Sequence, residues 1–124
     1  KPQTAMNVSV ATPNTAPTVS TPAGVNVAAS AGQSFQFSSL FAGNDTDNDA
    51  LTYYLYDSNA AANSGHFVVN GNIASAQTIY EVTAAQRAQT SIVAGASRTA
   101  DDMYVEAFDG RVYSGWNTCV HLYV

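Results

Sequence analysis

The segment Gly43-Asn44-Asp45-Thr46-Asp47-Asn48-Asp49-Ala50-Leu51-Thr52-Tyr53-Tyr54-Leu55-Tyr56-Asp57 decides the fold class, because it joins an acidic loop to an alternating strand. Leu51, Tyr53 and Leu55 occupy every second position, which is the period of a strand with one buried face. Outward from this segment, short apolar stretches are separated by clusters of Gly, Asn, Asp and Ser, as in all-β proteins. The sequence therefore predicts an all-β fold.

The apolar stretches predict about seven or eight antiparallel strands, arranged as a Greek-key sandwich of the immunoglobulin type. We expect them at Thr18–Val27, Gln33–Ser38, Leu51–Asp57, His66–Asn70, Gln77–Val82, Thr90–Val93, Met103–Phe108 and Thr118–Val124. Asn70-Gly71 predicts a tight hairpin with Asn72-Ile73, because both residues tolerate positive φ. Thr83 and Gln86 have the spacing of a capping box, which predicts one helix of at most two turns beginning at Thr83.

Period-two alternation also predicts the buried side chains. The predicted core residues are Phe35, Phe37, Leu51, Tyr53, Leu55, Val105 and Ala107. Two alternatives remain for the last strand: its buried face is either Val120, Leu122 and Val124, or Cys119, His121 and Tyr123.

The 124 residues, 46% of them hydrophobic and 10% charged, suit one packed domain with a largely uncharged polar surface. We expect residues 17–124 to be this domain and residues 1–16, which are rich in proline, to be a linker between repeats. Within the linker, the alternating segment Met6–Val10 indicates that it could instead hold the closing strand of a preceding unit.

Charge and hydropathy exclude several partners. Four basic residues against nine acidic ones give a net charge of −5, which lacks the positive surface that nucleic-acid binding needs. No segment approaches the roughly 18 apolar residues of a membrane-spanning helix, and no signal-peptide pattern is present. We therefore expect no nucleic-acid binding, no membrane insertion and no export signal within this stretch.

Residues that commonly act as nucleophiles or bases lack a catalytic context. Cys119 is the only cysteine, which excludes an internal disulfide, and we expect it to be a small buried hydrophobic residue. His66 and His121 are the only histidines, and neither accompanies a Gly-x-Ser-x-Gly elbow or a second histidine at metal-binding spacing. The sequence predicts a protein that is not an enzyme.

The carboxylates are concentrated in two segments, one holding Asp45, Asp47, Asp49 and Asp57 and the other Asp101, Asp102, Glu106 and Asp109. The alternating aspartates 45, 47 and 49 supply several of the oxygen ligands that calcium requires, whereas ordinary solvated turns are the alternative. The loop is not an EF-hand, because Ala50 and Tyr56 stand where that motif needs glycine and glutamate. In an immunoglobulin-like topology Asp109 would lie at the same pole as the three aspartates.

Three motifs together resemble the bacterial cadherin-like repeats of large secreted proteins, which often accompany the calcium-binding glycine-rich nonapeptide arrays of type I secreted adhesins. These are Asn14-Thr15-Ala16-Pro17, the loop from Asn44 to Tyr53, and Val105-Glu106-Ala107-Phe108-Asp109-Gly110. The resemblance implies an extracellular or cell-surface, non-catalytic sandwich that is monomeric as an isolated unit. Its partners would be neighbouring repeats of the same chain and a cell-surface or glycan target.

The resemblance also implies a metal site. It assigns Asp45, Asp47, Asp49 and Asp109 to calcium at the junction between repeats, where the ion would stiffen a tandem array used in adhesion. Asn14-Thr15 stands where animal cadherins place acidic ligands, and Asn48 where many bacterial repeats have glycine. Both departures predict weak calcium binding.

An alternative function rests on aromatic residues. Tyr54 and Tyr56 share the face of their strand opposite Tyr53 and Leu55, and together with Trp116 they would form a surface for stacking sugars. This predicts a carbohydrate-binding module, unless the tyrosines pack between the sheets.

Overall fold

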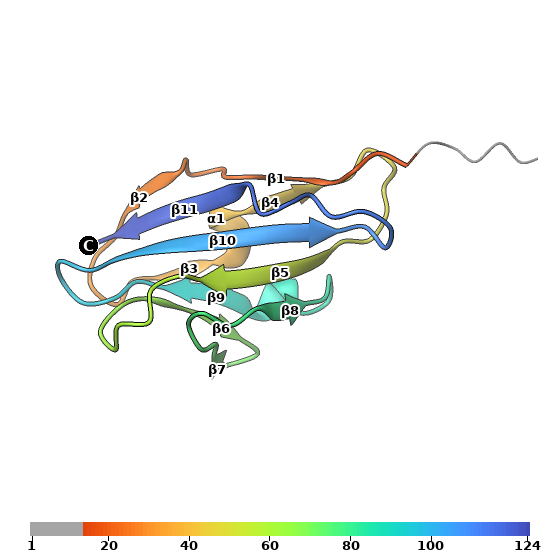
Figure 1. Ribbon diagram of the computed structural model, residues 1–124. Coiled ribbons are helices and arrows are strands. Elements are labelled where there is room, and N and C mark those ends of the chain that lie inside the picture. Colours follow the sequence, from red (N-terminus) through yellow and green to blue (C-terminus); the bar gives the residue numbers. More distant parts are fainter. Residues whose placement is uncertain (1–13) are drawn as a thin grey trace, which may run out of the picture.

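The computed structural model describes residues 14–124, where strands are the main regular secondary structure and are joined by turns and loops (Figure 1). The prediction for Met6–Val10 lies outside the described residues. The strands are β1 (Thr18–Ser20), β2 (Asn26–Ala28), β3 (Ser34–Gln36), β4 (Ala42–Asn44), β5 (Thr52–Asp57), β6 (His66–Val69), β7 (Asn72–Ile73), β8 (Tyr80–Val82), β9 (Thr90–Val93), β10 (Ala100–Phe108) and β11 (Thr118–Tyr123). Two short helical segments, α1 (Phe37–Leu40) and the 3₁₀ turn η2 (Arg87–Gln89), complete the fold. The prediction of an all-β protein is confirmed, but residues 14–124 contain eleven strands rather than the predicted seven or eight, and a second helical segment, α1, replaces the end of the predicted strand Gln33–Ser38.

The strands form three sheets. The largest has the order β2-β11-β10-β5-β8, the second has the order β3-β9-β6-β7, and β1 pairs with β4 in a two-stranded sheet. All neighbours are antiparallel except β2 and β11, which run parallel. The expectation of antiparallel strands alone is therefore wrong at this edge.

The parallel pair arises because the predicted strand Thr18–Val27 is broken in two. The N–H of Gly24 donates to the carbonyl of Thr21, and Gly24 has a φ of +90°, a conformation that glycine adopts without steric cost. This turn separates β1, which joins β4, from β2, which joins β11.

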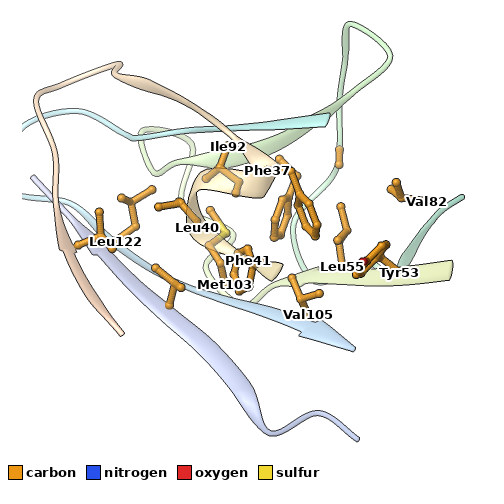
Figure 2. Close-up of a cluster of buried hydrophobic side chains, with 14 of the residues drawn as sticks. Phe37, Leu40, Phe41, Tyr53, Leu55, Val82, Ile92, Met103, Val105 and Leu122 are labelled. Atoms are coloured by element: carbon orange, nitrogen blue, oxygen red, sulfur yellow. The ribbon is translucent and has the colours of Figure 1, made fainter. Parts of the chain in front are cut away.

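The hydrophobic core lies between the five-stranded and four-stranded sheets, with α1 contributing from one side (Figure 2). Of the predicted core residues, six are buried: Phe37, Leu51, Tyr53, Leu55, Val105 and Ala107. Phe35 is only half-buried, because β3 ends at Gln36 and the chain turns into α1. The helical turn brings Phe37 and Leu40 onto one face, as its period requires, and both are buried.

In β11 the buried face is the one that carries Val120 and Leu122. Cys119 and His121 are half-buried on the opposite face, and Tyr123 is exposed there. The expectation that Cys119 is fully buried is wrong, because this face of β11 points away from the core.

Two local turn predictions are confirmed. Asn70 and Gly71 have φ values of 51° and 81°, and Val69 pairs with Asn72 across the hairpin. The capping box forms reciprocally: the N–H of Thr83 donates to Oε1 of Gln86 at 3.0 Å, and the N–H of Gln86 faces Oγ1 of Thr83 at 3.3 Å. The predicted helix beginning at Thr83 is wrong in its start, because the only helical residues here form the single 3₁₀ turn η2, which begins at Arg87. Within residues 14–124, neither helical segment has the length and apolar character that crossing a bilayer would demand.

Candidate functional site

The acidic loop, residues 45–51, connects β4 to β5 and is organised by Asp45. The carboxylate of Asp45 is buried, and its two oxygens accept the N–H groups of Asp47 at 3.2 Å and Asp49 at 2.9 Å. Its carbonyl accepts the N–H of Asn48, which has a φ of 60°. Asparagine tolerates this region of φ better than most other non-glycine residues, so Asn48 can adopt the turn without a glycine.

The loop brings three carboxylates together. One oxygen from each of Asp45, Asp47 and Asp49 lies within 4.8 Å of the others, and Asp47 and Asp49 are exposed. Two oxygens bound to one calcium ion at about 2.3–2.6 Å are separated by at most about 5 Å, so the trio fits a single ion. The remaining ligands of such an ion would have to come from water or from neighbouring groups.

Negative charge accumulates at this pole. Desolvation raises the pKa of Asp49, and the hydrogen bond and charge of Asp45, followed by the charges of Asp109 and Asp47, raise it further. A cation held by the trio would remove this repulsion.

Asp109 follows β10 and lies at the same pole, but it is not part of the trio. Its Oδ1 accepts the N–H groups of Arg111 and Val112, both at 2.8 Å, and its Oδ2 accepts Nδ2 of Asn14 at 2.8 Å. The hydrogen bond from Val112 is the largest influence on the pKa of Asp109, which is lowered despite desolvation. Asp109 therefore stays ionised, with both oxygens already accepting hydrogen bonds.

The linker residues contact both acidic segments. The N–H of Thr15 donates to Oδ2 of Asp47 at 2.8 Å, while Asn14 bonds to Asp109. Asn14 and Thr15, which stand where animal cadherins place acidic ligands, here donate hydrogen bonds to the carboxylates. Asn14 would have to rotate its amide to offer oxygen to an ion, which favours weak binding.

An aromatic groove opens on the outer face of the five-stranded sheet. It is defined by Tyr56, Ser58, Ile79, Tyr104 and Trp116, and its volume is about 420 Å³. Tyr56 pairs in register with Tyr104, with ring centroids 6.5 Å apart, and Trp116 is 38% exposed. Tyr56 and Trp116 were predicted from the sequence as surface aromatic residues. Ile79 and Tyr104 were not, because their place in the groove depends on strand register.

Tyr54 lies on the same face of β5 but outside the groove. Its ring is 5.8 Å from that of Tyr113, and its hydroxyl faces Oε2 of Glu81 at 3.4 Å. Tyr54 and Tyr56 are both half-buried on the face opposite Tyr53 and Leu55. They do not pack between the two large sheets.

The thiol and one imidazole lie on the outer face of β10 and β11. Nδ1 of His121 is 2.7 Å from Oδ1 of Asp102, the residue opposite it in register. Desolvation and then the charge of Asp102 raise the pKa of Cys119. The thiol therefore stays protonated at neutral pH, which is the unreactive form.

Comparison of the chain with protein-family models, with curated proteins and with solved structures gives no match.

Proposed function

We propose that residues 17–124 form a cadherin-like sandwich of the immunoglobulin type, a non-catalytic repeat of a secreted or cell-surface bacterial protein. The repeat binds calcium at the pole of the acidic loop and thereby stiffens a tandem array used in adhesion. The observation that carries this proposal is the group of three carboxylates, Asp45, Asp47 and Asp49, with oxygens within 4.8 Å of one another beside the linker.

The placement of the chain ends supports a tandem arrangement. Asn14 and Thr15 bond to the acidic pole, whereas the C-terminus lies at the far end of the molecule (Figure 1). A chain that enters a unit at one end and leaves at the other stacks head to tail, with each unit contacting its neighbours. An ion held where the linker meets the loop would restrict the angle between successive units.

The proposed site is weak. Three carboxylates come from one loop, and Asp109, the fourth assigned aspartate, already accepts three hydrogen bonds. Extracellular calcium modules have dissociation constants of about 0.1–1 mM, and we expect this site to fall in that range.

Calcium should raise the stability of the isolated chain, and Asp47→Asn should abolish the increase. At about 10 mM calcium the expected increment is about 1.4–2.7 kcal/mol, from RT ln(1 + [L]/Kd). Asparagine keeps an oxygen for the N–H of Thr15, so melting in chelator should hardly change. Thermal melts in calcium and in chelator measure both quantities.

Asp102→Asn is the matched control. Because Asp102 lies on the outer face of β10, this substitution should leave the calcium-dependent increase in stability unchanged.

A second experiment uses two copies of the chain fused head to tail. Small-angle scattering should show a narrower distance distribution with calcium, and Asp47→Asn should remove the effect. Identical melts of the wild type in calcium and chelator, with no amide shifts at the four aspartates, would contradict the metal site.

The aromatic groove favours a second candidate function, a carbohydrate-binding module. Tyr56, Tyr104 and Trp116 offer aromatic faces around a cavity of a size suited to a sugar ring, and Tyr54 extends the surface along β5. The two functions use different residues, so they can be separated by which amides respond to each ligand.

If the groove binds glycans, Trp116→Ala and Tyr56→Ala should each weaken the best ligand from a glycan array by about tenfold, the equivalent of about 1.4 kcal/mol. Tyr123→Ala is the control, because Tyr123 is an exposed tyrosine outside the groove. Amide shifts during sugar titration locate the site. An array without ligands, or shifts away from the groove, would rule out this function for these residues.

A further inference from the structure

Two buried carboxyl groups lie together at the end of the domain opposite the acidic loop. Asp57 ends β5 with 3% of its surface exposed, and Asp101 lies near the start of β10 with 1% exposed. Asp57 pairs in register with Met103, so Asp101 is its diagonal neighbour on the adjacent strand. Both side chains face inward, on the same faces of their strands as the buried residues Leu55 and Met103.

Each carboxyl group has one satisfied oxygen and one without a partner. Oδ1 of Asp57 accepts the N–H of Asn59 at 3.0 Å, and Oδ2 of Asp101 accepts the N–H of Gly65 at 2.5 Å. Oδ2 of Asp57 and Oδ1 of Asp101 are buried and find no hydrogen-bond donor among residues 14–124. Two ionised carboxylates in this arrangement would repel each other while each left an unpaired oxygen away from water.

We propose that Asp57 and Asp101 share one proton in the folded domain, with the two unpartnered oxygens joined by a single O–H···O hydrogen bond, and that losing this proton loosens the loop of residues 58–65. A protonated carboxyl is a donor as well as an acceptor, so one proton satisfies both oxygens and removes one of the two charges.

The surroundings of the pair favour protonation. Burial raises the pKa of Asp57 to about 7; the N–H of Asn59 opposes this shift, and the charge and hydrogen bond of Asp101 add to it. His66 lines the same cavity as Asp57, and Asp102 points to the other face of β10, where it pairs with His121. Because the two carboxyls interact, the near-neutral titration belongs to the pair rather than to either residue alone.

The two carboxyl groups accept hydrogen bonds from both ends of the loop between β5 and β6. Asp57 holds the N–H of Asn59, Asp101 holds the N–H of Gly65, and Nδ2 of Asn59 bonds to the carbonyl of Ala100 at 2.8 Å. A Cβ at residue 65 would lie 2.5 Å from the carbonyl oxygen of Val93 and 2.9 Å from the Asp101 carboxylate, so glycine is needed for this close approach. Repulsion within the pair would therefore act first on this loop.

A proton suits the pair better than a metal ion. Calcium requires six to eight oxygen ligands, and only one oxygen of each carboxyl is free here. One proton needs no further ligand.

The sign of the pH effect follows from the raised pKa. The folded chain binds more protons than the unfolded chain between the ordinary aspartate pKa of 3.8 and about 7. The extra stability is therefore complete below about pH 4, falls as the pH rises through this window, and is lost above about pH 7.

The test compares melting in chelator at about pH 5 and about pH 8, where the wild-type Tm should fall by about 10 °C. In Asp57→Asn the amide donates permanently to Oδ1 of Asp101, so this fall should disappear and the variant should melt above the wild type at about pH 8. Asp102→Asn is the control: Asp102 is adjacent to Asp101 in sequence but lies on the outer face, so this variant should show the same fall in Tm as the wild type. Carbon-detected NMR should show a carboxyl titration near neutral pH in the wild type, and the Gly65 amide should exchange more slowly in Asp57→Asn at alkaline pH.

Three results would overturn the proposal. The first is that both carboxyls titrate only in the ordinary acidic range, and the second is that Asp57→Asn melts below the wild type at alkaline pH. The third concerns cations and uses the Asp47→Asn background, which removes the acidic-loop site. If calcium or magnesium restores the alkaline Tm there, but not when Asp57→Asn is added, the pair holds a cation rather than a proton.

Discussion

Val105→Asp is expected to unfold the domain. Val105 is fully buried in the middle of β10, where it pairs with Thr118 of β11 on one side and Leu55 of β5 on the other. The substitution loses about 1.5–3 kcal/mol of apolar burial and places an unpaired charge in the core at a cost of several kcal/mol more. The free energy of unfolding of a domain of this size is about 5–15 kcal/mol, so little or no folded protein should remain.

Circular dichroism and amide NMR dispersion measure the outcome. Val25→Asp is the matched control, since Val25 is 57% exposed and the same substitution there should change stability by less than about 0.5 kcal/mol. A folded Val105→Asp protein within about 1 kcal/mol of the wild type would show that Val105 does not face the core.

Phe37→Ala should cost about 3–5 kcal/mol, the range for removing a buried phenylalanine. Phe37 is fully buried at the start of α1, with its ring stacked 5.5 Å from that of Phe41 and edge-on 5.3 Å from that of Tyr53. Truncation leaves a cavity beside the rings of Phe41 and Tyr53.

Denaturant unfolding of Phe37→Ala beside Phe35→Ala provides the comparison. Phe35 is half-buried at the edge of the core, so its truncation should cost distinctly less, about 1–2 kcal/mol. Equal costs at the two positions would favour a continuous strand through residues 33–38 over the helical turn of α1.

Clustered carboxyl groups lie at both ends of the domain, and the repulsion between them would be relieved in a different way at each end. In the acidic loop two of the three clustered carboxylates are exposed, so an ion could reach them and complete its ligands with water. In the pair of Asp57 and Asp101 both groups are buried and one oxygen of each is unpartnered, which suits a single proton. Calcium and pH should therefore act on opposite ends of the same unit.

Features that depend on near neighbours along the chain were predictable from the sequence. Alternation in β5 and β10 identified Tyr53, Leu55 and Val105 as core residues, because a strand sends successive side chains to opposite faces. The hairpin at Asn70-Gly71 and the capping box at Thr83 followed from backbone rules that operate over two to four residues.

Features that depend on which segments meet were decided only by the tertiary structure. Asp57 was grouped by sequence with the aspartates of the acidic loop, yet the six residues of β5 carry it about 20 Å away to meet Asp101. The turn at Gly24, the helical turn at Phe37 and the groove that joins Tyr56 to Trp116 likewise depend on long-range packing. The local sequence pattern specifies which face of its strand a side chain lies on. Which other side chains it contacts is set by strand order and register across the whole chain.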